Sequence, residues 1–304
     1  MSKAMKIWLI AAGTLIFLGI IIFVVAMSIM EWNFMNLSTV EYEKNSYEIN
    51  ETFSNIIVNS STAEIQILPS DDDKCRVECN DDKKAKHYAT VNDDTLEIDV
   101  VNEKKWYDYI SIGIGSWEEK ITVYLPTMEY NSLCIKSSTS DVRVSENFTF
   151  KNIDISLSTG DAFCYANGID NVNIKTSTGK IIVDNIFAGD VNLTTSVGNI
   201  VLSYVTCNNL ISSGNTGDIE LKNVIASEKI DINRSTGDVI FEDSDGAEIF
   251  VVTDTGDVEG SLLSQKVFVI RTDTGDVEVP DSIEGGRCEI KTDTGDVCIN
   301  IHRN

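Results

Sequence analysis

A short phrase returns at nearly fixed intervals along the second half of the chain, as Ser-Thr-Gly-Asp in early copies and Asp-Thr-Gly-Asp-Val in later ones. Successive copies of its glycine are 19 or 20 residues apart. These glycines are Gly160, Gly179, Gly198, Gly217, Gly237, Gly256, Gly275 and Gly295. A fixed period of this size indicates a repeat architecture.

Alignment of the repeats on this glycine places apolar residues in the same columns of almost every copy. In one copy these are Val172 and Ile174 before the glycine and Ile181 and Val183 after it. Their period-two spacing predicts two short strands around a tight turn. A third apolar position follows each second strand and is represented by Ile186, Val205, Val224 and Leu263.

One such repeat cannot bury its apolar face alone, whereas coils stacked about 4.8 Å apart join their columns into one core. The sequence therefore predicts an all-β fold, a single-stranded β-solenoid of 19–20-residue coils over residues 133–304. A β-sandwich is disfavoured because its strand and loop lengths vary. Residues 51–132 are expected to hold an N-terminal coil, with Ile56, Val58, Ile65 and Ile67 in its core columns, and an aperiodic β cap region.

The segment from Ile7 to Met30 carries no charge and would span about 36 Å as a helix, enough to cross a bilayer. Lys3 and Lys6 precede it, so the positive-inside rule predicts a cytoplasmic N-terminus (1–6), a transmembrane signal anchor (7–30) and an extracellular remainder. Residues 31–50 are expected to form a polar spacer. The competing interpretation is a cleaved signal peptide, which the long apolar run disfavours.

The predicted outer part is strongly acidic. Without Lys3 and Lys6 it has 22 basic and 48 acidic residues, a net charge of −26. This balance excludes nucleic acid as an expected partner and repels anionic polymers unless cations intervene.

Two groups of residues are candidate sites. The aromatic cluster Trp106, Tyr107, Tyr109 and Trp117 either caps the first coils or binds a partner. Carboxylates flank the later turns at Asp254, Asp257, Asp273, Asp276, Asp293 and Asp296. Aspartate is common in tight turns because it bonds to the turn backbone, but stacked carboxylates also repel, so a calcium ladder between coils is the alternative. No other cofactor is expected.

Catalytic constellations are not evident. The two histidines, His87 and His302, lie far apart in the sequence and neither has a local partner that suggests a triad or a zinc site. The coils also lack the long insertions that would wall a groove. The seven cysteines cannot all pair within one chain, and most are predicted to be free thiols.

The last strand, Asp296 to His302, is expected to form the open end of the solenoid, with only Arg303 and Asn304 to cover it. Exposed strand edges pair with other backbones, so this end is predicted to meet a second copy end to end or a partner strand.

The apolar anchor, the Ile-Thr-Val-Tyr-Leu-Pro phrase at 121–126, the strand pair from Leu133 to Val144 and the repeated turns resemble the bacterial β-strand-repeat adhesin family, which includes the membrane-anchored protein of the lia envelope-stress operon. The resemblance covers residues 53–301. It implies a right-handed solenoid on the outer face of a Gram-positive-type cell membrane, and it supplies no catalytic residues.

These patterns together predict a non-enzymatic, single-pass protein of the cell envelope that acts in binding, adhesion or scaffolding, with a wall polymer or an envelope protein as its partner. The alternative is an auxiliary component of an envelope-stress response that works through a membrane partner.

Overall fold

The computed structural model of the protein describes residues 2–32, 41–106, 108 and 119–302. The contacts divide the chain into two units, and each is described by itself. The first comprises Met1–Glu43, Asp82–Ala85 and Asn102–Trp117, and the second comprises Lys44–Asp81, Lys86–Val101 and Glu118–Asn304.

The first unit contains helix α1 (Lys3–Ile29), which is long and apolar enough to cross a membrane. The Ser2 hydroxyl caps it by accepting a hydrogen bond from the N–H of Met5 at 3.3 Å. Nearly all side chains along the helix are exposed, and Trp8 retains 75% of its surface. A helix that has apolar side chains on every face has no polar face to turn toward water. This pattern is typical of a membrane-spanning helix.

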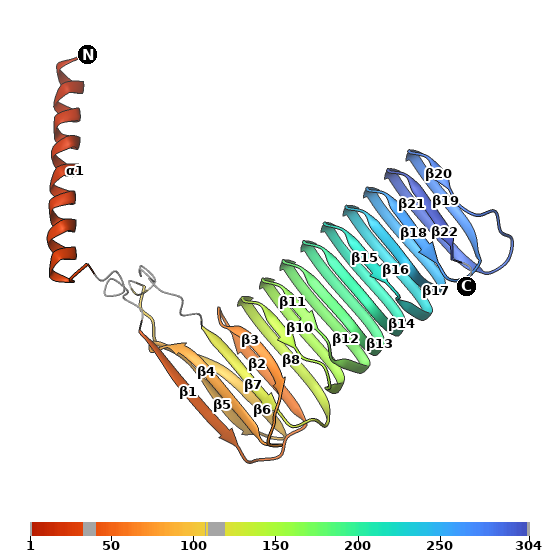
Figure 1. Ribbon diagram of the computed structural model, residues 1–304, viewed down its shortest axis with the longest axis horizontal. Coiled ribbons are helices and arrows are strands. Elements are labelled where there is room, and N and C mark those ends of the chain that lie inside the picture. Colours follow the sequence, from red (N-terminus) through yellow and green to blue (C-terminus); the bar gives the residue numbers. More distant parts are fainter. Residues whose placement is uncertain (1, 33–40, 107, 109–118, 303–304) are drawn as a thin grey trace. The chain divides into compact units, whose positions relative to one another are not determined.

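Apart from the ends of β1, β4, β5 and β6, the strands belong to the second unit (Figure 1). In chain order they are β1 (Tyr42–Ile49), β2 (Asn55–Ser60), β3 (Glu64–Pro69), β4 (Cys75–Asp82), β5 (Ala85–Asn92), β6 (Thr95–Asn102), β7 (Lys120–Leu125), β8 (Glu129–Thr139), β9 (Val142–Val144), β10 (Thr149–Thr159), β11 (Ala162–Cys164), β12 (Asn167–Thr178), β13 (Ile181–Val197), β14 (Ile200–Thr216), β15 (Ile219–Lys222), β16 (Ile225–Thr236), β17 (Val239–Thr255), β18 (Val258–Leu262), β19 (Lys266–Thr274), β20 (Val277–Glu278), β21 (Gly286–Thr294) and β22 (Val297–Ile301).

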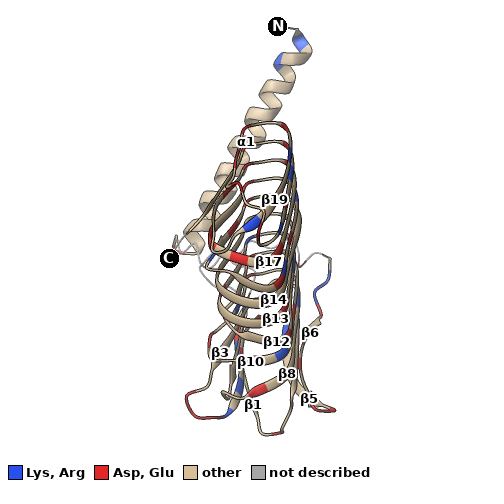
Figure 2. Ribbon diagram, turned by 90° about the vertical axis from the view of Figure 1, so that its right-hand side faces the viewer, with Lys and Arg blue, Asp and Glu red and all other residues tan. Residues whose placement is uncertain are grey.

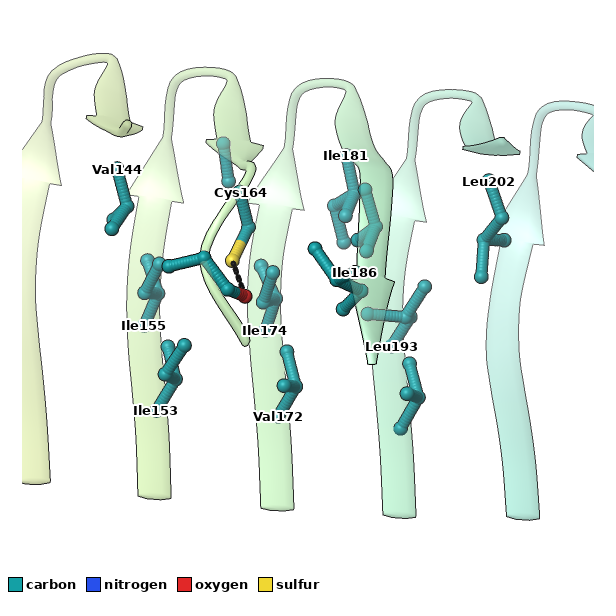
Figure 3. Packing of buried hydrophobic residues seen from close by; sticks show 14 of the residues in the cluster. Val144, Ile153, Ile155, Cys164, Val172, Ile174, Ile181, Ile186, Leu193 and Leu202 are labelled. Atoms are coloured by element: carbon teal, nitrogen blue, oxygen red, sulfur yellow. Dashed lines mark hydrogen bonds between the residues drawn. The ribbon is translucent and has the colours of Figure 1, made fainter. Parts of the chain in front are cut away.

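The predicted β-solenoid is confirmed by the register of its parallel strands. Val172 pairs with Val191, which pairs with Leu210, so each coil stacks on the next with equivalent residues in contact. The predicted columns form one continuous apolar core, part of which is seen in Figure 3. Ile186, Val205 and Val224 are buried as expected, but the assignment of Leu263 is wrong. The ladder between β17 and β18 is irregular between Phe241 and Ser244, so Leu262 takes the core position and Leu263 remains 37% exposed.

A second corner, which the sequence pattern did not reveal, follows the glycine turn after six residues. Its residues have φ near +50° in four successive coils, at Asn185, Tyr204, Asn223 and Asp243. Asparagine and aspartate tolerate this left-handed conformation, which explains their recurrence. The 19–20-residue period therefore contains two turns.

The N-terminal coils do not stack in chain order. The predicted first coil, β2 and β3, lies between β8 and β9 on one side and β6 and β7 on the other. β4 then runs antiparallel to β7 and covers that strand, with Arg76 stacked over the Tyr124 ring at 4.6 Å. The predicted spacer 31–50 is partly wrong, because β1 (Tyr42–Ile49) lies within it and pairs with β4.

The distal coils are also out of order, which overturns the expectation for the chain end. β17 pairs with β21, and β21 pairs in turn with β19, while β22 lies between β18 and β20 (Figure 1). The strand at 297–301 is therefore interior, with Val297 and Ile299 buried. It also holds the end of the described chain, since the N–H of His302 donates to the Leu262 carbonyl at 2.8 Å. The outermost coil is the one at 266–280.

One column near the glycine turn is polar and buried. In five coils a threonine hydroxyl donates to the carbonyl of the turn glycine in the neighbouring coil, at Thr176, Thr195, Thr253, Thr272 and Thr292.

In two adjacent coils this column holds Gly214 and Arg234 instead. Arg234 is only 1% exposed, and a Cβ on Gly214 would lie 2.0 Å from its Nη1 atom, so the glycine leaves room for the guanidinium. The Arg234 Nη1 donates to the Thr195 carbonyl at 3.4 Å, and burial lowers the pKa of the side chain.

Candidate functional site

The aspartates that follow the turn glycines connect successive coils through the backbone. Asp238 Oδ1 accepts the N–H of Asp257 at 2.8 Å, Asp257 Oδ1 accepts that of Asp296, and Asp296 Oδ1 accepts that of Asp276, both at 2.8 Å. Each bond is charge-assisted, and each gives a hydrogen-bond acceptor to a backbone N–H of the turn that is not paired within the strand ladder. Figure 2 shows acidic positions, in red, distributed along the solenoid. This ladder therefore has a structural role whether or not it binds a cation.

The second set of predicted ligands has basic neighbours. Lys291 Nζ lies 3.3 Å from Asp293 Oδ1, and Arg271 Nε lies 3.9 Å from Asp273 Oδ1. Because coil 286–301 is inserted, Asp293 stands between Asp254 and Asp273 rather than at the end. Among the described residues, no group of three or more His, Cys, Asp or Glu side chains is placed to hold a metal ion. The calcium ladder remains a prediction.

The calcium hypothesis can be tested by thermal unfolding. If cations bridge the stacked carboxylates, millimolar calcium relieves their repulsion and raises the melting temperature. Changing Asp254, Asp273 and Asp293 together to Asn should abolish this rise, and the parent chain in magnesium serves as a control for screening. A parent chain without any calcium response would leave the aspartates with their backbone role alone.

The aromatic cluster is only partly visible. Trp106 lies in the first unit and is 77% exposed. Tyr107, Tyr109 and Trp117 lie outside the described residues. Partner binding by this cluster therefore stays a prediction, as does its alternative role as a cap.

An outward-facing apolar stripe, which the sequence reading missed, crosses three coils of the solenoid. Phe163, Ile182 and Val201 are register partners and lie on the side of their strands away from the core. At one end the Arg143 guanidinium lies 4.2 Å from the centre of the Phe163 ring and donates to the Tyr165 hydroxyl at 3.2 Å. The signal was present in the sequence, because this column is apolar in three consecutive repeats although it faces outward.

Five of the seven thiols are buried, which disfavours nucleophilic chemistry at them. All seven cysteines are free, and burial raises the pKa of the Cys79 thiol to about 12, so it stays protonated near neutral pH. Cys79 adjoins a cavity of ≈ 360 Å³ lined by residues of β1, β4 and β7, among them Lys44, Asn45 and Thr122. Lysine, amide and hydroxyl groups give this cavity a polar lining beside the Cys79 thiol.

A buried pair of one histidine and one aspartate joins β4 and β5. His87 Nδ1 is 2.7 Å from Asp81 Oδ1, and both side chains are almost fully buried. The sequence analysis did not predict Asp81 as a partner of His87. The two side chains come together only when β4 and β5 have folded against each other. The second histidine, His302, contacts Asp243 at 2.7 Å. The two histidines do not come together.

The fold and these features define the class of protein, a parallel β-solenoid with an appended apolar helix. The chain belongs to the Toastrack DUF4097 family, which matches residues 53–208 and 188–304. No curated protein matches the sequence.

Solved structures are similar at low sequence identity. A candidate adhesin from Bacteroides fragilis is 17% identical with a TM-score of 0.44, and the similarity covers 86% of this chain and 97% of that one. A candidate lipid-binding protein from Parabacteroides distasonis is 16% identical with a TM-score of 0.49, over 86% and 97% of the two chains. A candidate adhesin from Parabacteroides merdae is 13% identical with a TM-score of 0.35, over 87% and 93%.

Proposed function

We propose that the protein is a membrane-anchored, extracytoplasmic binding protein of the cell envelope, which displays its solenoid to a wall polymer or an envelope protein. The observation that carries this proposal is α1, a 27-residue helix whose apolar side chains are nearly all exposed. Such a surface is stable in a bilayer and costly in water. Lys3 and Lys6 before the uncharged stretch favour an orientation with the solenoid outside.

The solenoid itself favours binding over catalysis. Its repeated strands present long, regular outer columns, such as the apolar stripe Phe163, Ile182 and Val201. Regular stacked surfaces of this kind suit extended ligands, because equivalent contacts recur with each coil. The adhesin descriptions of similar structures agree with a binding role.

Protease treatment of intact, wall-stripped cells tests the orientation. We expect added protease to remove the solenoid and to leave a short membrane-bound stub that contains α1. A tag before Lys3 should remain protected, because the predicted cytoplasmic segment is out of reach of the protease. Protection of the whole chain would contradict the proposed topology, and release of an intact solenoid into the medium would indicate a cleaved signal peptide.

Crosslinking in living cells tests the binding role. A photoreactive group in place of Ile182, on the apolar stripe, should attach an envelope component, whereas the same group in place of Val101 serves as an exposed control in β6. Labelling of neither position would contradict a binding role for the outer columns.

A further inference from the structure

The outermost distal coil leaves one strand edge open. β19 pairs with β21 and β20 pairs with β22, and among the described residues no strand pairs with their opposite sides, which we call the distal edge. The apolar columns also end here. Val277 is 49% exposed, whereas its register partner Val297 is fully buried. Phe268 and Ile270 are likewise only partly covered, although Cys288 and Ile290 beside them are buried.

The direction of the backbone groups shows which residues are free to bond. The carbonyl of Thr274 accepts the N–H of Gly295 at 2.9 Å, so Thr274 points toward the inner coil. Successive residues of a strand direct their N–H and C=O groups to opposite sides, but the ladder skips the pair of Asp273 and Asp293, so the alternation is interrupted there. In an inner coil Thr195 occupies the same column as Thr272, and its carbonyl oxygen points to the next coil outward, where a Cβ on Gly214 would lie 2.1 Å from it. Phe268, Ile270 and Thr272 therefore direct their N–H and C=O groups to the distal edge, where a further strand can pair with them.

The charges around this edge specify what kind of strand fits. The exposed acidic residues of the coil and of the loop after it are Asp273, Asp276, Glu278, Asp281 and Glu284. Arg271 is the exposed basic residue of β19, and it already lies beside Asp273. Two such ends would repel each other, which disfavours a second copy, whereas a basic strand is complementary.

We propose that the distal edge is a docking site for an extended segment of a partner protein in which apolar and basic residues alternate. The segment adds a strand beside β19. Its apolar side chains cover Phe268 and Ile270, and its basic side chains lie among the acidic residues. This inference goes beyond the proposed function, since it does not depend on where the chain is anchored.

The test uses the full chain in detergent micelles and two synthetic peptides as long as β19, nine residues. One peptide alternates lysine with valine, and the other alternates glutamate with valine. Thr272→Pro removes an N–H from the distal edge, and Thr272→Val, which loses the same hydroxyl but keeps that N–H, is the matched control. We expect the lysine peptide to bind the parent chain and Thr272→Val equally and to bind Thr272→Pro about tenfold more weakly or worse.

Four results would overturn the proposal. These are equal binding to Thr272→Pro, equal binding of the glutamate peptide, no binding of the lysine peptide, and self-association of the parent chain without peptide, which would identify a second copy as the occupant. If Thr272→Pro does not fold, amide exchange in the parent chain decides. Slower exchange at Phe268, Ile270 and Thr272 on peptide addition supports the docking site, and unchanged exchange refutes it.

Discussion

Val297→Asp is expected to destabilise the protein by about 4 kcal/mol or more, although it lies in the last strand of the chain. The reason is its place in the stack. Val297 is fully buried and pairs with Val258 on one side and Val277 on the other. A carboxylate there has no counter-ion and no water, and both flanking coils would have to separate to hydrate it. Thermal unfolding followed by circular dichroism measures the loss.

The matched control is Val277→Asp, in the equivalent position of the outermost coil. Val277 is 49% exposed, so a carboxylate at this site remains hydrated and should cost less than about 1 kcal/mol. A solenoid stacked in chain order predicts the opposite ranking, because residue 277 would then be interior and residue 297 terminal. Equal effects, or a larger effect at Val277, would contradict the inserted coil.

The columns of the solenoid could be read from the sequence because each rests on local alternation. Ile56, Val58, Ile65 and Ile67 were assigned to a coil from period-two spacing, and all four are fully buried. Burial of one face is a strong constraint on register, since a shift by one residue would expose every apolar side chain.

The order of the coils could not be predicted, because the same columns that reveal the repeat make the repeats interchangeable. Cys288 fits between Ile249 and Phe268 as well as a residue of the preceding repeat would. Local patterning therefore does not distinguish sequential stacking from insertion. The deciding contacts are specific ones, such as Lys266 Nζ to Asp245 Oδ1 at 2.5 Å, which hold the crossing chain.

In the candidate sites, too, some features could be predicted from the sequence and others could not. Aspartate after glycine was read from the sequence as turn chemistry, and its bonds prove to run between coils, as from the Lys180 N–H to Asp161 Oδ1 at 2.7 Å. The buried Arg234 was missed, although a signal existed. Arginine stands there in a column of threonines, and Gly214 stands in the same column 20 residues earlier. Considered together, these two exceptions would have indicated that the large Arg234 side chain occupies the space left by the missing side chain of Gly214.

The glycine turns have the second large expected effect. Gly217 has φ +128°, and a Cβ at this residue would lie 2.2 Å from the carbonyl oxygen of Gly198 in the neighbouring coil. Gly217→Ala therefore combines a conformation that L-residues avoid with a clash against backbone that cannot move without displacing the coil. We expect a loss of at least about 3 kcal/mol in the free energy of unfolding.

The first repeat offers the control, because Ser140 occupies the same column without a left-handed φ. Its hydroxyl donates to the Ser137 hydroxyl at 2.7 Å, so Ser140→Gly should cost only that bond and some chain entropy, about 1 kcal/mol. If Gly217→Ala lowered the free energy of unfolding no more than Ser140→Gly does, small size would be the sole requirement of this column. A large difference between the two variants would instead show that stacked coils need glycine, since each turn approaches the carbonyl of the coil before it too closely for any side chain.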